Sequence, residues 1–171
     1  ETSDTLGFVA KGDDLPNAVV RSEGEIKRVE PLLKDLPDGH RLKIEFGTVP
    51  GSTIGHDHDV RYVRQVTTVD AKGRPDGLEV AYGGWSGHAV RTTTYENGLK
   101  QGVEKHCDPK SGAVKIEVPW VKGRIHGIKR RFSVGGKIAS ETPYRNGLIH
   151  GASRSFDEEG RVDKDCQGSY E

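Results

Sequence analysis

The segment His56-Asp57-His58-Asp59 is the densest cluster of metal-ligating side chains in the sequence. On an extended segment, residues two apart face the same side, so His56 and His58, or Asp57 and Asp59, could offer nitrogen or oxygen ligands to a divalent metal. No Cys-x-x-Cys pair and no His-x-x-x-His pair elsewhere completes such a site. A solvated polar loop is therefore the favoured interpretation, with a metal site as the alternative.

Histidine and glutamate also recur at fixed places in the chain. His126 and His150 share one place, and the corresponding positions elsewhere hold Asp76 and Gln101, which favours a hydrogen-bonding turn residue over a catalytic one. The recurring glutamates are expected to be solvent-face charges that pair across neighbouring strands. They are Glu117 and Glu141.

No set of side chains in the sequence has the spacing of an enzyme site. There is no Ser-His-Asp or Cys-His arrangement, and the glycine-rich stretches are not followed by the helix that a phosphate-binding loop requires. We therefore predict that the chain is not an enzyme and needs no cofactor.

Composition limits the class of protein and its partners. Basic and acidic residues number 26 each and are interspersed, so no electrostatic basis exists for duplex nucleic-acid binding. No stretch approaches 18 apolar residues, so no membrane span is predicted. Only 32% of residues are hydrophobic and 23 are glycine. Because the glycines are regularly placed, a thin β-architecture with many turns is favoured over disorder.

Glycine spacing shows that the chain is a tandem repeat. Three parallel series recur every 24–25 residues, and fixed-period self-similarity of this length indicates a repeat architecture. The series are Gly73, Gly98, Gly123, Gly147; Gly77, Gly102, Gly127, Gly151; and Gly87, Gly112, Gly136, Gly160. Each repeat is predicted to be a β-hairpin with these glycines at its turns, since a Cβ there would be strained.

Apolar side chains fall into columns when the repeats are aligned on their glycines. We expect the columns to form the apolar stripe of one face of an elongated, open-ended, antiparallel sheet of about six hairpins. The columns are Tyr82, Cys107, Phe132, Phe156; Ala89, Val114, Ile138, Val162; and Tyr95, Trp120, Tyr144.

The N-terminal part repeats the pattern in weaker form. Gly24 and Gly39 have the same 15-residue spacing as Gly87 and Gly102, which places Ile26 in the Ala89 column. We therefore predict degenerate hairpins over residues 1–69, with an inserted loop over 47–59, and regular repeats over 70–171.

The units Tyr95-Glu-Asn-Gly98-Leu-Lys-Gln-Gly102 and Tyr144-Arg-Asn-Gly147-Leu-Ile-His-Gly151 resemble MORN repeats. They are most similar to the bacterial variant found in proteins described as antitoxin components of toxin–antitoxin systems. The resemblance covers residues 70–165 well and residues 1–69 poorly. It implies an elongated antiparallel sheet of stacked hairpins, and it supports the fold more than any one function.

The two cysteines, Cys107 and Cys166, are predicted to lie five strands apart. At about 4.8 Å per strand their separation is roughly 24 Å, too far for a disulfide within one chain. We expect free thiols, with an intermolecular disulfide as the alternative.

The predicted ends of the sheet point to assembly. Neither end carries a polar cap, and an uncapped edge strand offers unpaired backbone groups for strand addition. We expect each copy to pair head-to-tail with the next and so build a fibre. The residues assigned to the assembly edges are Leu6, Phe8, Val9, Val162, Cys166 and Tyr170.

The alternative function is a monomeric protein-binding module of antitoxin or immunity type. It would use aromatic anchors on one sheet face, namely Tyr82, Trp85, Tyr95, Trp120 and Tyr144. The chain begins at Glu1 and has no methionine. We therefore expect that an export signal has been removed and that the protein is secreted or lies at the cell surface.

Overall fold

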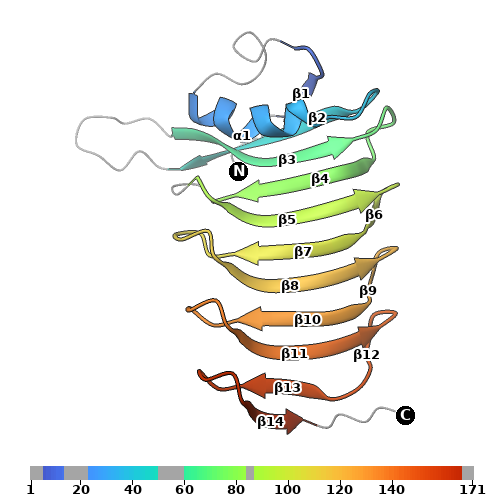
Figure 1. Cartoon of the computed structure of the whole chain (residues 1–171). Helices are drawn as coiled ribbons and strands as arrows, with labels where there is room; N and C mark the ends of the chain where they lie inside the picture. Colours follow the sequence, from blue (N-terminus) through green and yellow to red (C-terminus); the bar gives the residue numbers. More distant parts are fainter. Residues whose placement is uncertain (1–5, 14–22, 50–59, 84–86, 167–171) are drawn as a thin grey trace, which may run out of the picture.

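A single antiparallel sheet dominates the computed structural model, which describes residues 6–13, 23–49, 60–83 and 87–166 (Figure 1). Over these residues the sheet has 14 strands, and one helix, α1 (Glu23–Lys34), lies against its N-terminal end. The predicted all-β, open, single sheet is confirmed. The main strands follow one another in space in chain order: β1 (Leu6–Ala10), β2 (Arg41–Val49), β3 (Val60–Val69), β4 (Pro75–Tyr82), β5 (Ala89–Glu96), β7 (Gly102–Cys107), β8 (Val114–Val121), β10 (Gly127–Phe132), β11 (Ile138–Arg145), β13 (Ser153–Phe156) and β14 (Val162–Cys166).

Three short strands extend the long strands of the repeats. They pair with the last two residues of β5, β8 and β11, so each repeat ends in a tight tip. The tips also stack on one another, because the amide N–H of each tip glycine donates to a carbonyl of the preceding repeat. These bonds are Gly98 to Pro75 (2.8 Å), Gly123 to Lys100 (2.9 Å) and Gly147 to Ile125 (2.8 Å). The short strands are β6 (Leu99–Lys100), β9 (Arg124–Ile125) and β12 (Leu148–Ile149).

Backbone dihedrals explain the tip sequences. Asn97 and Gly98 have φ of 51° and 82°, and Asn146 and Gly147 have 53° and 90°. Two consecutive residues with positive φ define the type I′ turn, whose twist matches the flanking strands. All twelve repeat glycines have positive φ, the conformation that glycine adopts without strain.

Two of the turns at the opposite ends of the hairpins, those after β7 and β13, are fixed by an aspartate, Asp108 and Asp157 respectively. In one of these turns, Asp157 accepts the backbone N–H of Glu159 and of Arg161, and its other oxygen accepts the Arg161 Nε–H at 2.9 Å. A similar loop, between β3 and β4, places Asp70 in the same role toward Lys72 and Arg74. These side-chain bonds fix the loop and lower the pKa of the Asp70 and Asp157 carboxyl groups, chiefly through the backbone N–H donors.

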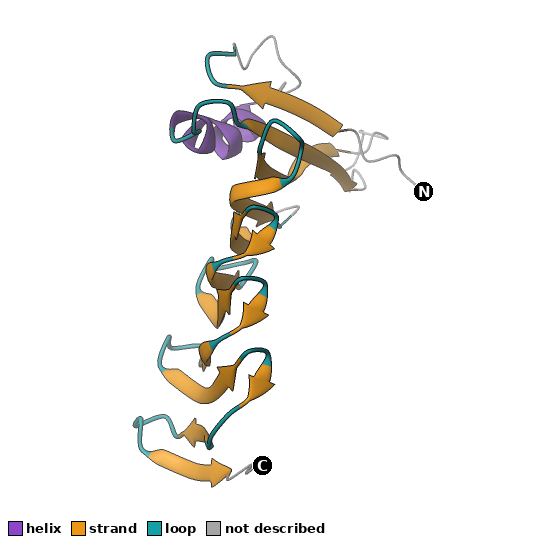
Figure 2. Ribbon diagram, turned by 90° about the vertical axis from the view of Figure 1, so that its right-hand side faces the viewer, coloured by secondary structure: helices purple, strands orange, loops and turns teal. Residues whose placement is uncertain are grey.

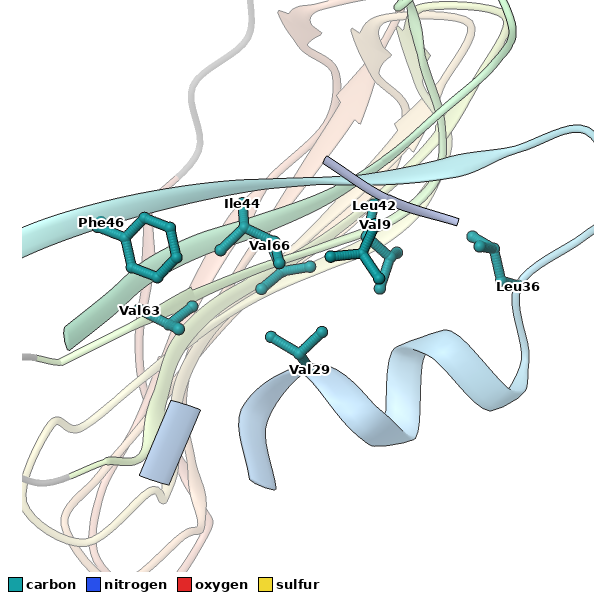
Figure 3. Close-up of a cluster of buried hydrophobic side chains, with 8 residues drawn as sticks. All are labelled: Val9, Val29, Leu36, Leu42, Ile44, Phe46, Val63 and Val66. Atoms are coloured by element: carbon teal, nitrogen blue, oxygen red, sulfur yellow. The ribbon is translucent and has the colours of Figure 1, made fainter. Parts of the chain in front are cut away.

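Helix α1 occupies the place where a degenerate hairpin was predicted, so that prediction was wrong. Ile26 lies in the helix, not in a strand column. Its spacing with Val29 and Leu33 is helical and turns one apolar side toward the sheet. Figure 3 shows the resulting core between α1 and β1–β3. It consists of Val9, Val29, Leu36, Leu42, Ile44, Phe46, Val63 and Val66.

The inserted loop is shorter than predicted. Strand β2 continues through Gly47 to Val49 and remains paired with β3 up to the pair Val49–Val60. Both strands are therefore longer than the strands of the repeats. Residues 50–59 lie outside the described part of the chain.

The sheet has two faces, which the pairing register identifies. We call the face covered by α1 the helix face; it carries Val9, Leu42, Ile44 and Val66. The other, the far face, carries Thr67, Glu79, Thr93 and Glu104.

The apolar columns do not share one face, contrary to prediction. Tyr82 pairs with Ala89, and its hydroxyl donates to the Arg28 carbonyl of α1 at 2.9 Å, so this column lies on the helix face. Tyr95 pairs with Gly77, five residues before Tyr82, which places it on the far face. An odd spacing along a strand reverses the face, which the column alignment overlooked.

The buried side of the sheet changes from one end to the other. In β1–β3 the helix face is buried beneath α1. From β5 onward, the buried side chains among the described residues are Thr93, Glu104 and Val118, all on the far face. Strands β3 and β4 form the crossover, because in each of them adjacent side chains on opposite faces are buried: Val66 and Thr67 in β3, and Glu79 and Val80 in β4. Figure 2 shows the outcome, a thin elongated body with the helix at one end only.

Candidate functional site

The two edge strands of the sheet, β1 and β14, contain most of the residues predicted for assembly. Each strand pairs with one neighbour only in the described part of the chain. Phe8 and Val162 are about half exposed, at 49% and 52%, whereas Val9 is fully buried under α1 and can offer only its backbone. Leu6 and Cys166 lie on these strands, and Tyr170 lies outside the described residues.

The direction of the edges restricts how copies can join. An even number of antiparallel pairings separates β1 from β14, so the two strands run in the same direction. Stacking one copy on the next by translation would therefore set β14 beside β1 as a parallel pair, in a sheet that is otherwise antiparallel. The edges are not directly complementary in the way the sequence indicated.

The N-terminal edge carries a cation on the far face. Phe8 and Arg41 lie on the face opposite Val9, and the Arg41 guanidinium lies over the Phe8 ring, 5.2 Å from its centroid. Among the described residues, Arg41 has no carboxylate within ion-pair distance. Arg41 belongs to β2, so the edge strand β1 is itself uncharged and the cation reaches it through the Phe8 ring.

The far face holds two buried carboxylates, one in each of two successive repeats. Glu79 accepts hydrogen bonds from Gln65 (3.0 Å), Thr67 (3.3 Å) and Arg91 (3.2 Å). Each donor comes from a neighbouring strand, so the carboxylate ties β3, β4 and β5 together. Buried charges are stable only when paired and hydrogen-bonded in this way.

Glu104 makes the equivalent contacts one repeat later. It accepts from Thr93 at 3.3 Å, from the Lys100 ammonium, and contacts His106 at 2.6 Å. Burial alone would raise the pKa of Glu104, but the hydrogen bonds and charges of Lys100 and His106 outweigh it and lower the pKa. The Lys100 ammonium also lies 4.7 Å from the Trp120 ring centroid.

A row of aromatic rings borders these carboxylates. Tyr95 and Trp120 pair with Gly77 and Gly102, and Tyr144 pairs with Gly127, so each ring lies opposite a residue without a side chain. The Trp120 indole N–H is buried and, within the described residues, has no hydrogen-bond partner. This row is the part of the far face best suited to contact another molecule.

The recurring turn position links successive repeats. Asp76 accepts the backbone N–H of Asn97 at 2.9 Å, and Gln101 accepts that of Lys122 at 2.8 Å. The hydrogen-bonding role predicted for this position is confirmed at these two residues, although the bond reaches the next tip. Asp76 also binds His40 Nε2 at 2.9 Å, which ties the loop before β2 to the repeats.

Metal and thiol predictions have different outcomes. His56, Asp57, His58 and Asp59 lie outside the described residues, and the described part of the chain contains no group of three or more potential ligands. Within this chain Cys107 is a free thiol, and burial raises its pKa; the intermolecular disulfide stays the alternative prediction. In the described residues, no helix has the length and apolar character needed to cross a membrane.

Sequence reasoning missed the buried glutamates. Their signal was weak: Glu79 and Glu104 stand two residues after the second glycine of their repeats, but the next repeat has Lys129 at that place. Glu117 and Glu141, predicted to pair across strands, do so: Lys105 lies 4.0 Å from Glu117, and Arg130 lies 2.9 Å from Glu141.

Comparisons of the chain with protein families, with curated proteins and with solved structures gave no match.

Proposed function

We propose that the protein is a non-enzymatic structural protein that assembles end to end into a fibre, by pairing β14 of one copy with β1 of the next. The observation that carries the proposal is that, among the described residues, an edge strand without a second neighbour lies at each end of one continuous antiparallel sheet. Such edges present rows of unpaired N–H and C=O groups, and pairing is the general way to satisfy them. A fibre of this kind is consistent with a secreted or cell-surface protein.

Local features favour pairing over protection at the β1 edge, whereas β14 (Val-Asp-Lys-Asp-Cys) has charged residues at three of its five positions. Native proteins block edges with lysine, proline or a covering element. Strand β1 has the sequence Leu-Gly-Phe-Val-Ala, without charge or proline. Phe8 and Val162 add exposed apolar area at the two ends. The MORN-like hairpin array supports the proposal only in supplying an elongated sheet.

The test uses one substitution at each edge. Phe8→Lys and Val162→Lys place a charge on an edge strand at half-exposed positions, so neither buries the ammonium. The matched controls are Phe8→Tyr and Val162→Thr. Deleting residues 1–12 is a poorer test, because it removes the core residue Val9.

Negative-stain electron microscopy and sedimentation velocity give the readout. Intact protein and both controls should form filaments, and each lysine variant alone should not. An equimolar mixture of the two variants retains one free edge of each kind and should stop at dimers. Discrete monomers of the intact protein at every concentration would refute the proposal. Dimers that Val162→Lys abolishes and Phe8→Lys leaves intact would also refute it, because they would be closed pairs of β14 with β14.

A second candidate function is binding of a partner protein by the far face. The observation that favours it is the aromatic row, in which the Trp120 indole N–H has no partner among the described residues and the Lys100 ammonium that contacts Glu104 lies over the Trp120 ring. Tyr82 does not belong to such a surface, since its hydroxyl is bound to α1, and Trp85 lies outside the described residues. A monomeric chain that co-purifies with one protein, and loses it on Trp120→Ala but not on Cys107→Ala, would support this function instead.

A further inference from the structure

The turns inside successive hairpins stack along the side of the sheet opposite the tips (Figure 1). One repeat position, directly after the turn glycine, bridges from one turn to the next. The His88 ring reaches the following turn, because its Nδ1 lies 3.2 Å from the place where a Cβ on Gly112 would be. The Lys137 ammonium donates to the carbonyl of Glu158 at 2.6 Å. Ala113 holds the same repeat position at the junction between these two, and its methyl group is too short to bridge.

A cavity of about 310 Å³ lies at this middle junction, between the turn over residues 108–113 and the start of the next turn. Its walls are mainly apolar and include the half-buried side chains of Val114, Ile116 and Phe132. Val134, whose side chain is fully exposed, also lines it. At about 30 Å³ for a water-sized group, the cavity has room for about ten heavy atoms.

The cavity also contains a cation without a partner. In the preceding repeat, His106 holds the position of Arg131 and contacts the Glu104 carboxylate at 2.6 Å. Lys129 stands at the position of Glu104 in the next repeat, so the carboxylate is missing there. In the part of the chain that the structure describes, the Arg131 guanidinium has no hydrogen bond and no ion pair.

The carboxylate that lines the cavity is already bound. Asp108 accepts the Lys115 ammonium at 2.5 Å and the backbone N–H groups of Lys110 and Ser111 at 2.9 Å each. These bonds, the one from Lys115 above all, hold the pKa of Asp108 far below its usual value. The charged side chains of the lining are therefore one carboxylate and two cations, which leaves one positive charge at Arg131 uncompensated.

Apolar walls around a single uncompensated guanidinium determine the kind of ligand. A guanidinium matches a carboxylate through two parallel hydrogen bonds. An anion with two or more charges would place the additional charge against apolar side chains, which is costly. An apolar group beside a single carboxylate satisfies both parts of the cavity.

We infer that this cavity binds a small carboxylic acid, with its carboxylate on Arg131 and its apolar part against Ile116, Phe132 and Val134. Two departures from the repeat meet here, since Ala113 leaves the space and Lys129 leaves Arg131 without a carboxylate. The ligand is either a free acid or the C-terminal residue of a peptide with an apolar side chain, because both present the same chemistry. The inference goes beyond the proposed assembly and does not depend on it.

Saturation-transfer NMR on the full chain is the test, because it detects weak ligands on assembled and on monomeric protein. The probe 3-phenylpropionate should bind with a Kd of about 1 mM or tighter. Its neutral amide and acetate should each bind about ten-fold more weakly, since one lacks the charge and the other the apolar group. The dipeptide Gly-Phe, with a free or an amidated C-terminus, distinguishes the two sources: whichever carboxylate binds more tightly identifies the natural ligand class.

Two substitutions at exposed positions remove the two halves of the site. Arg131→Gln should weaken binding of 3-phenylpropionate about ten-fold or more, whereas Arg124→Gln, at a tip, should leave the Kd unchanged. Ala113→His should close the cavity as His88 does at the preceding junction, and so abolish binding. Urea midpoints close to wild type show that each variant is folded.

Lys137→Ala is the control for space without charge. It removes the bridge at the next junction, where Ser155 holds the position of Arg131, and should add no second binding site. A second site in Lys137→Ala, or an unchanged Kd in Arg131→Gln, would overturn the role of Arg131. Failure of both the free acid and the dipeptide to bind wild type would overturn the inference, whether or not the protein forms filaments.

Discussion

Glu104→Gln tests whether the far face is held together by its buried carboxylates. The substitution keeps the size of the side chain and one oxygen acceptor but removes the charge. Lys100 and His106 then lose their ionic partner, and one of them faces an amide N–H instead of an oxygen.

The expected loss follows from these contacts. A hydrogen bond to a charged group contributes about 1.5–3 kcal/mol. Water offsets part of this loss by hydrogen-bonding to Lys100 and His106, because their side chains are 28% and 41% exposed. We therefore expect Glu104→Gln to lower the free energy of unfolding by about 2 kcal/mol. With a urea m-value of about 2 kcal/mol/M, the unfolding midpoint falls by about 1 M.

The matched control is Glu117→Gln on the neighbouring strand. Its carboxylate lies 4.0 Å from Lys105 and is 25% exposed. Surface pairs of this kind contribute about 0–1 kcal/mol, so the midpoint should move by less than about 0.5 M. Urea titration at pH 7, followed by tryptophan fluorescence and far-ultraviolet circular dichroism, measures both variants.

Acid should remove the difference between wild type and Glu104→Gln. The folded pKa of Glu104 is lowered, so its stabilising contribution is fully present above the unfolded value of 4.5 and is lost as the pH falls through the folded pKa. Equal midpoints for the two proteins at pH 7, or an equal loss in Glu117→Gln, would refute the reasoning.

Two further predictions concern a glycine and a histidine. Gly77→Ala should cost about 3 kcal/mol, because φ is 125° and the new Cβ would lie 2.9 Å from Thr68 Cβ. Gly136→Ala, with φ of 77° and no atom within 4 Å of the new Cβ, should cost about 1 kcal/mol, and equal urea midpoints would contradict this. The Asp76 hydrogen bond raises the pKa of His40, so its stabilising contribution is present below pH 6.5 and is lost as the pH rises through the folded pKa. An NMR titration should place the His40 midpoint above 6.5 in wild type and nearer 6.5 in Asp76→Asn; the same midpoint in both would argue against the pair.

The repeat and its turns could be predicted from sequence because their causes are local. A residue such as Gly98 or Asn146 adopts positive φ according to its own side chain and its immediate neighbours. Periodic glycines therefore identify the hairpins, and the hairpins imply an open antiparallel sheet.

The helix was missed because its evidence is not local. Residues 23–34 contain Pro31 and have a glycine spacing that mimics a repeat. Their helical apolar spacing gains stability only when Val29 meets Leu42 and Ile44, which come from strands later in the chain.

Which face each side chain occupies, and therefore how two copies can meet, was decided by the tertiary structure. Sequence alone placed Tyr82 and Tyr95 in comparable columns, although strand pairing sets them on opposite faces. Sequence alone also gave no sign that Glu104 is buried, because its contacts with Thr93 and Lys100 form only when the strands pair. Dihedral preferences act within a few residues. The sheet face that a side chain occupies, its burial and the direction of the edge strands depend instead on how many strands pair and in what order.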